Sequence, residues 1–197
     1  MSKEKRQIEK KDLMPEDIYI NNRKQIRREL IEFKKHRRVS LGPYATFYFE
    51  SFETMLAQVQ EMLYIEKGGD EQLNDELMAY NPLVPNGKEL TATLMFEIDN
   101  PVSRNTFLGK VGGIEEKIFI KIDNEIVKAI PEKDVDRTSP NGKASSVQFI
   151  NFKLNDSQIA KFRSNNFAIE IGIDHKEYSH KTKFTEKNIK SLSLDFN

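Results

Sequence analysis

The sequence predicts an α+β fold, in which about five or six helices pack on a mostly antiparallel sheet of about seven strands. Two observations support this prediction. Segments with the two-residue alternation of strands are joined by short turns, which is typical of antiparallel pairing. Segments with helical spacing are inserted between groups of strands and do not alternate one for one with them, as they would in a parallel α/β protein.

The N-terminal half is predicted to contain a helix that begins near Pro15, a longer helix that Asn22 can cap, a β-hairpin and two further helices. Apolar residues at spacings of four and three indicate that the longer helix is amphipathic and basic. A Gly-Pro turn between alternating segments indicates the hairpin. Apolar stripes of helical period before and after a Gly-Gly pair indicate the two further helices. The residues behind these predictions are Ile26, Leu30 and Phe33; Gly42 and Pro43; Met55, Leu56, Val59, Met62 and Leu63; Gly68 and Gly69; and Leu73, Leu77 and Met78.

The C-terminal half is predicted to be richer in strands. Alternation is clearest over residues 89–98, and Asn100-Pro101 then fits the cap and first residue of a short helix. Residues 118–130 fit a hairpin around a polar turn. The remaining predicted elements are a strand at 145–152, a short helix after Asn155, a strand at 167–173, a strand at 178–184 that pairs back on it, and a weak helix after Thr185.

Residues 1–11 are expected to form a polar tail, and residues 12–197 a single domain. The loop at 131–144 is the one candidate boundary within that range. Separation there would leave the following strand with an unpaired edge. One domain is therefore predicted.

Composition excludes several classes of chemistry. The chain contains no cysteine, so it has no disulfide, no thiolate metal site and no cysteine nucleophile. It begins without an apolar leader, and no window approaches the roughly 18 apolar residues of a membrane span. A cytoplasmic protein without membrane contact is expected.

Familiar catalytic and nucleotide-binding motifs are missing as well. There is no phosphate-binding Walker loop, nucleophile elbow, zinc-protease motif or dinucleotide fingerprint. His175 and His180 flank a predicted turn and are best interpreted as solvated. No metal site is predicted, and no cofactor is identified.

Charge is segregated along a chain whose formal net charge is zero. From Arg23 to Arg38 there are eight Lys or Arg against two Glu, whereas from Glu50 to Tyr80 eight Asp or Glu face a single Lys. The basic helix is a candidate surface for a partner protein or, less favoured, for nucleic acid. The alternative is a solvated basic face. The candidate partner-binding residues are Arg23, Arg27, Arg28, Lys34, Arg37 and Arg38.

Carboxylates beside hydroxyl and amide groups form the second candidate site. Residues of one strand face and of a neighbouring strand could bring carboxylates together, as a general acid and base or as ligands for a hard cation. The alternative is a solvent-facing sheet surface. Glu61 projects away from the helix stripe and is expected to be solvated. The candidate catalytic residues are Glu50, Glu89 and Glu97, and the candidate ligand-binding residues are Tyr48, Gln58, Gln60, Thr91 and Thr93.

Five segments in fixed order resemble an uncharacterised bacterial family of domains of unknown function. They are RRVSLGPYATFYFES, QVQEML, YNPLVP, ELTATLMFE and VQFINF, and the resemblance runs from about Asp12 to Phe152. Genes of that family often neighbour genes for rubrerythrin-like proteins and for iron–sulfur proteins similar to heterodisulfide reductase subunits. The resemblance implies a redox or peroxide-defence setting but carries no catalytic residue across. The chain departs from the family pattern at Tyr64, where a basic residue is expected.

Three functions follow from these observations. The first is an accessory or binding protein that docks to an iron–sulfur or di-iron partner, since a chain without cysteine cannot hold a cluster by thiolates. The second is a small metal-assisted or acid–base enzyme that uses the carboxylates. The third is a nucleic-acid binder that uses the basic helix.

Overall fold

The computed structural model describes residue 4 and residues 6–132, 138–164 and 166–197. The predicted α+β class is confirmed, but the strands are divided between two antiparallel sheets. Sheet A has the order β1-β2-β3-β7-β6, and sheet B has the order β5-β4-β8-β9. The strands are β1 (Arg38–Leu41), β2 (Ala45–Phe49), β3 (Glu89–Phe96), β4 (Ile118–Ile122), β5 (Glu125–Lys128), β6 (Ile130–Pro131), β7 (Val147–Lys153), β8 (Ile169–His175) and β9 (Tyr178–Lys183).

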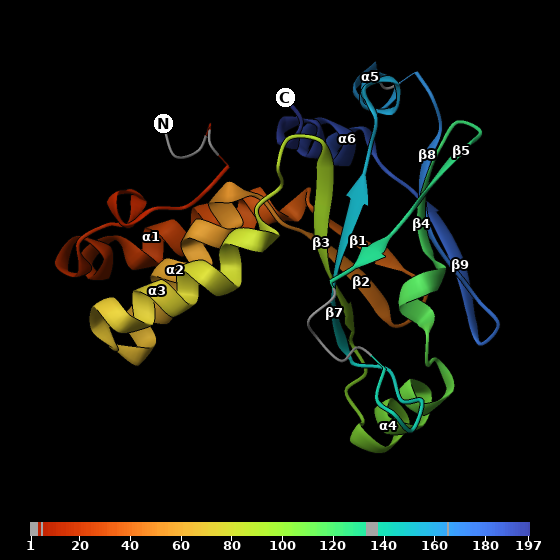
Figure 1. Ribbon diagram of the computed structural model, residues 1–197, viewed down its shortest axis with the longest axis horizontal. Helices are drawn as coiled ribbons and strands as arrows, with labels where there is room; N and C mark the ends of the chain where they lie inside the picture. Colours follow the sequence, from red (N-terminus) through yellow and green to blue (C-terminus); the bar gives the residue numbers. More distant parts are fainter. Residues whose placement is uncertain (1–3, 5, 133–137, 165) are drawn as a thin grey trace.

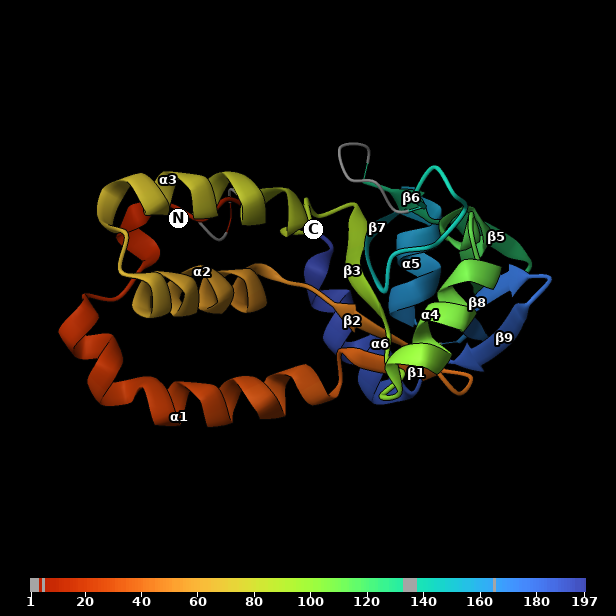
Figure 2. The same ribbon diagram turned by 90° about the horizontal axis from the view of Figure 1, so that it is seen from below.

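The helices fall into two groups. Three of them, α1, α2 and α3, lie together beside the sheets (Figure 1), with α2 between the other two (Figure 2). The others lie around the sheets. The α-helices are α1 (Glu16–Lys35), α2 (Phe52–Glu66), α3 (Gly69–Tyr80), α4 (Pro101–Lys110), α5 (Asp156–Ser164) and α6 (Glu186–Leu192). Short 3-10 turns are η1 (Lys10–Asp12), η2 (Asn81–Leu83), η3 (Ile114–Lys117) and η4 (Ser193–Asp195).

The larger hydrophobic core is formed by one face of each sheet. In β3 the alternating residues Leu90, Ala92, Leu94 and Phe96 are buried in it, as the period of two predicts. Inward residues of β4 and β8 join the same core from sheet B. The phenol of Tyr178 in β9 connects the sheets, because it donates to a carbonyl of β1 and accepts the Ala45 N–H of β2 at 3.0 Å.

A smaller core joins the helices to the outer face of sheet A. It contains residues of α2 and α3, and Phe149 of β7 packs against it. Ile8 belongs to this core and is only 1% exposed, although residues 1–11 were expected to be a polar tail. Asn81 holds the main chain of Ile8 through hydrogen bonds of 2.7 and 3.2 Å. Gln60 holds Met14 in the same manner, at 2.7 and 3.3 Å.

Helix α1 is attached to α2 by a polar cluster around Glu61. Arg23 donates to both oxygens of this carboxylate, and Tyr19 donates to it at 2.6 Å. The Glu61 carboxylate is therefore bound by two residues of α1. The sequence had predicted that it would be solvated. The hydrogen bonds from Arg23 lower the pKa of Glu61 to about 2, and burial together with the Glu61 bond raises the pKa of Tyr19 to about 12.

A second polar cluster, centred on Arg37, lies between α1 and β1. Its guanidinium donates to the carbonyls of Phe49 (3.0 Å), Glu50 (2.6 Å) and Ser191 (3.1 Å), and it forms an ion pair with Asp195. Arg37 is 1% exposed. Burial raises the pKa of Asp195 to about 6 against the attraction of Arg37.

Among the helices of the described residues, none combines the length and the apolar character needed to cross a bilayer. Residues 133–137 of the loop predicted at 131–144 lie outside the described residues.

Replacement of Arg37 by Ala is predicted to lower the free energy of unfolding by about 3–5 kcal/mol, because it leaves the buried Asp195 carboxylate without a counter-ion. Urea unfolding at pH 7 measures this difference. Lys35→Ala, an exposed neighbour, is the control and should change stability by no more than about 0.5 kcal/mol. Equal effects of the two substitutions would contradict the role given to Arg37.

Glu61→Gln is predicted to cost about 1 kcal/mol at pH 7, within the range for partly exposed charged hydrogen bonds. The folded-state pKa of Glu61 lies below its usual 4.5. The stabilisation is therefore present above pH 4.5 and is lost as the pH falls toward about 2. Urea titrations from pH 7 to pH 3 should show the difference between wild type and variant shrinking with falling pH. A difference that stays constant would show that the ion pair does not stabilise the fold.

Candidate functional site

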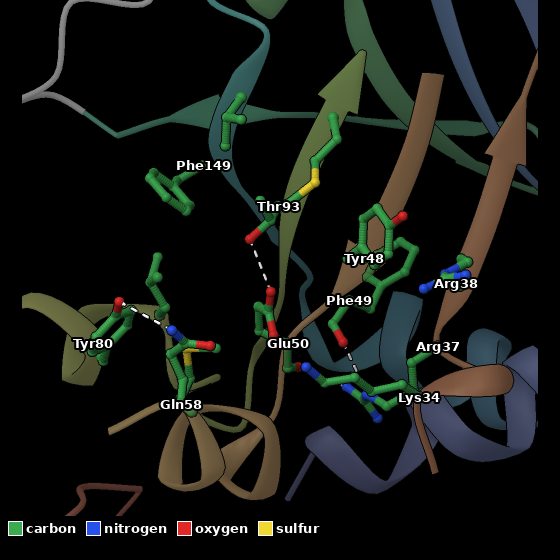
Figure 3. A pocket seen from close by; sticks show the side chains of 14 residues that line it. Lys34, Arg37, Arg38, Tyr48, Phe49, Glu50, Gln58, Tyr80, Thr93 and Phe149 are labelled. Atoms are coloured by element: carbon green, nitrogen blue, oxygen red, sulfur yellow. Dashed lines mark hydrogen bonds between the residues drawn. The ribbon is translucent and has the colours of Figure 1, made fainter. Parts of the chain in front are cut away.

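A pocket of about 350 Å³ lies between the end of α1, the outer face of sheet A and the helices α2 and α3. We call it the Glu50 pocket (Figure 3). It brings together residues that the sequence assigned to two different sites. The lining residues are Lys34, Arg37, Arg38, Tyr48, Phe49, Glu50, Met55, Gln58, Tyr80, Leu83, Thr93, Met95, Val147 and Phe149.

Glu50 occupies the centre of the pocket. It follows β2 directly and precedes Ser51, whose side chain caps α2, so the carboxylate lies near the positive end of a helix. Thr54 and Thr93 each donate a hydroxyl hydrogen bond to it, at 2.7 and 2.8 Å. The main-chain N–H of Glu50 donates to the carbonyl of Thr91 at 2.8 Å. Glu50 is 8% exposed, and its position is fixed from both sides.

The cationic side of the pocket is formed where α1 meets β1. Arg37 is used internally, but the side-chain ammonium of Lys34 forms no hydrogen bond or ion pair within the described part of the chain. Arg38 is exposed, and its guanidinium lies 4.7 Å from the centre of the Tyr48 ring. Lys34 and Arg38 thus bring two cationic groups to the pocket.

The opposite side of the pocket is amide, phenol and apolar. Gln58 of α2 donates to the hydroxyl of Tyr80 at 3.4 Å. Met55, Leu83 and Phe149 add apolar wall. Figure 3 shows Gln58, Tyr80 and Phe149 on one side of Glu50 and the cationic residues on the other.

Glu97 lies outside the Glu50 pocket but contacts its lining. Tyr48 donates to the Glu97 carboxylate at 2.6 Å. That bond, with one from Thr46, lowers the pKa of Glu97, whereas burial raises the pKa of Tyr48. Glu97 is exposed and acts here as the acceptor that orients Tyr48.

Glu89 and Thr91 lie toward the other end of β3 and do not line the pocket. Glu89 pairs in register with Lys153, and burial raises its pKa. Thr91 is buried, and within the described residues its hydroxyl has no hydrogen-bond partner. Of the three candidate catalytic carboxylates, Glu50 lines the pocket, and Glu89 and Glu97 do not. The described residues contain no group of three or more His, Asp or Glu side chains able to hold a metal ion.

The six basic candidates have different environments. Arg23 is bound by Glu61 and its guanidinium lies 4.7 Å from the centre of the Tyr64 ring, and Arg37 is buried, so neither offers its charge to a macromolecule. Arg27 and Arg28 are exposed on α1. Lys34 and Arg38 belong to the Glu50 pocket. The charge count suggested a continuous basic surface for nucleic acid. Because Arg23 and Arg37 are engaged within the protein, the basic surface of α1 is shorter than that count suggested.

Comparisons with known proteins give a family and a fold but no activity. Residues 7–196 match the model of a family described as protein of unknown function (DUF3501). A crystal structure of a novel protein of unknown function from Burkholderia pseudomallei is similar to this chain, with 35% sequence identity and a TM-score of 0.89. The similarity covers 96% of this chain and 99% of that one. A search of curated proteins finds no match.

Proposed function

We propose that this chain, which belongs to the DUF3501 family of proteins of unknown function, binds a small organic anion in the Glu50 pocket. The observation that carries the proposal is the pair of cations, Lys34 and Arg38, at one side of the pocket. Neither has a carboxylate within ion-pair distance in the part of the chain that the structure describes. With Arg37 neutralised by Asp195, the pocket lining carries two cations and one carboxylate, and Glu97 lies outside the lining near Arg38. The excess of cations in the lining attracts an anion.

Size and lining support a small molecule. The volume of about 350 Å³ lies within the roughly 300–1,000 Å³ of ligand pockets, which combine apolar walls with a few polar groups. Met55, Leu83 and Phe149 supply such walls. A ligand with an acidic group, carboxylate or phosphate, and an apolar body fits this combination.

Binding is better supported than acid–base catalysis. The reaction that the sequence suggested uses a pair of carboxylates, so it needs a second carboxylate in reach of the reacting atom. Of the described residues that line the pocket, Glu50 alone is a carboxylate. Glu89 and Glu97, the other two candidates, lie outside it.

Anion binding is predicted to depend on Lys34 and Arg38. Isothermal titration with 3-phenylpropionate and phenyl phosphate should show binding, and the uncharged 3-phenylpropan-1-ol should bind at least tenfold more weakly. The double variant K34A/R38A should lose at least tenfold in affinity for both anions, because the attraction to the acidic group is removed.

The matched control is K24A/K35A, which removes two exposed lysines of the same helix. It should bind like wild type. Anions that bind no more tightly than the alcohol, or an equal loss in the control, would refute the proposal.

Docking to an iron–sulfur or di-iron protein is a second candidate, favoured by one observation. Arg27 and Arg28 are exposed on α1, which lies at the edge of the helical group (Figure 2). Charges so placed steer association in a salt-dependent manner.

A purified rubrerythrin-like protein from the same genome is the probe for this docking. R27E/R28E is expected to weaken its binding at least tenfold at low salt, and added salt should weaken binding to the wild type. The control K187E/K190E makes the same change of charge on α6, far along the sequence. Binding that is independent of salt and of both double variants would exclude docking through α1.

A further inference from the structure

The carboxylate of Glu50 lacks a cationic partner. It accepts one hydroxyl on each oxygen, from Thr54 and Thr93. Arg37 is close, but its guanidinium bonds the main-chain carbonyl of Glu50 and pairs with Asp195. No ion pair of Glu50 exists within the described residues. A negative charge that is 8% exposed is unfavourable unless it is paired or fully hydrogen-bonded.

The acceptor capacity of this carboxylate is half used. Two carboxylate oxygens offer about four lone-pair positions, and the threonine hydroxyls occupy two of them. Because the carboxylate lines the pocket, the remaining positions are available to a bound molecule. A donor with positive charge would satisfy both the hydrogen-bonding capacity and the charge of Glu50.

A metal ion fits this position poorly. Calcium takes about six to eight oxygen ligands and magnesium about six, with several of them carboxylates or waters. Glu50 is the single carboxylate among the described lining residues, and Lys34 and Arg38 bring positive charge to the same pocket. The donor at Glu50 is better supplied by an organic ammonium group.

We propose that the ligand is zwitterionic and resembles an apolar α-amino acid, with its ammonium group on Glu50 and its acidic group on Lys34 and Arg38. This inference rests on the proposed anion binding. The order of the groups in the pocket carries it, since Glu50 lies between the cationic side and the wall that contains Phe149 (Figure 3). An α-amino acid presents acid, amine and apolar side chain around a single carbon.

The arrangement separates a zwitterion from a simple anion. Without an amino group, an acid that binds Lys34 and Arg38 also brings negative charge toward Glu50, which is unfavourable at short range in a partly buried site. With the amino group, the same acid gains a charge-assisted hydrogen bond. The amino group is thus the feature that the pocket selects.

Isothermal titration with matched pairs of ligands tests the inference. The pairs are phenylalanine with 3-phenylpropionate, leucine with 4-methylpentanoate, and methionine with 4-(methylthio)butanoate. For at least one pair, the amino acid is expected to bind wild type at least tenfold more tightly than its partner acid. In Glu50→Gln this advantage should disappear, while affinity for the partner acid is kept or rises, because the repelling charge is gone.

The outcomes separate the two proposals. Partner acids that bind through Lys34 and Arg38, with no pair showing a gain from the amino group, would overturn the zwitterion and leave anion binding intact. Phenethylamine that binds as tightly as phenylalanine would overturn anion binding. Glu71→Gln, an exposed carboxamide substitution on α3, is the control and should keep the wild-type preference. If Glu50→Gln fails to fold, the comparison of pairs on wild type decides alone.

Discussion

The buried guanidinium of Arg37 is the interaction on which the rest of the arrangement depends. Its donors reach three carbonyls and one carboxylate, from the end of β2, the residue that follows it, α6 and the C-terminal turn η4. Such a buried charge is tolerated only when its donors are satisfied and its charge is paired. One of the acceptors is the carbonyl of Glu50. Arg37 therefore both links these segments and positions Glu50 at the centre of the pocket.

The cationic side of the pocket follows from the local geometry next to Arg37. Helix α1 ends at Lys35 and β1 begins at Arg38, so Arg37 and Arg38 lie at a change from helical to extended backbone. In extended chain, neighbouring side chains point to opposite sides. Arg37 enters the protein and Arg38 remains exposed. One short basic segment therefore supplies both a structural cation and a cation for a ligand.

Local sequence patterns predicted the helices and strands well, but they predicted poorly which side chains of different elements lie close together. The alternation of β3 gave its buried face, and Asn100 caps α4 at the expected residue. The same strand misled the assignment of a carboxylate cluster, because Glu89 and Glu97 share a face but are eight residues apart. At roughly 3.3 Å per residue they are separated by about 26 Å. Two residues on the same face of a strand are therefore close together only if few residues separate them along that strand.

Other predictions differ from the structure because the periodicity of a segment does not show which other segments pack against it. Glu61 points away from the apolar stripe of its own helix, as the sequence indicated, yet α1 crosses that side and supplies Arg23 and Tyr19. Likewise Ile8 is a single apolar residue in a charged segment, with no periodic pattern to mark it. It is buried because Asn81 fixes its main chain against the smaller core.

The pocket lies where the helical group leaves the outer face of sheet A incompletely covered. The outer face of sheet A is an antiparallel sheet face of the kind that normally faces water, and the helical group covers only part of it. Where the cover is close, Thr91 is buried. Where it ends, Thr93 and Glu50 line a pocket. The polar side chains of this face are of the kind that suits a solvated sheet surface, but here the helices enclose them. Their unused hydrogen-bonding capacity is available to a ligand.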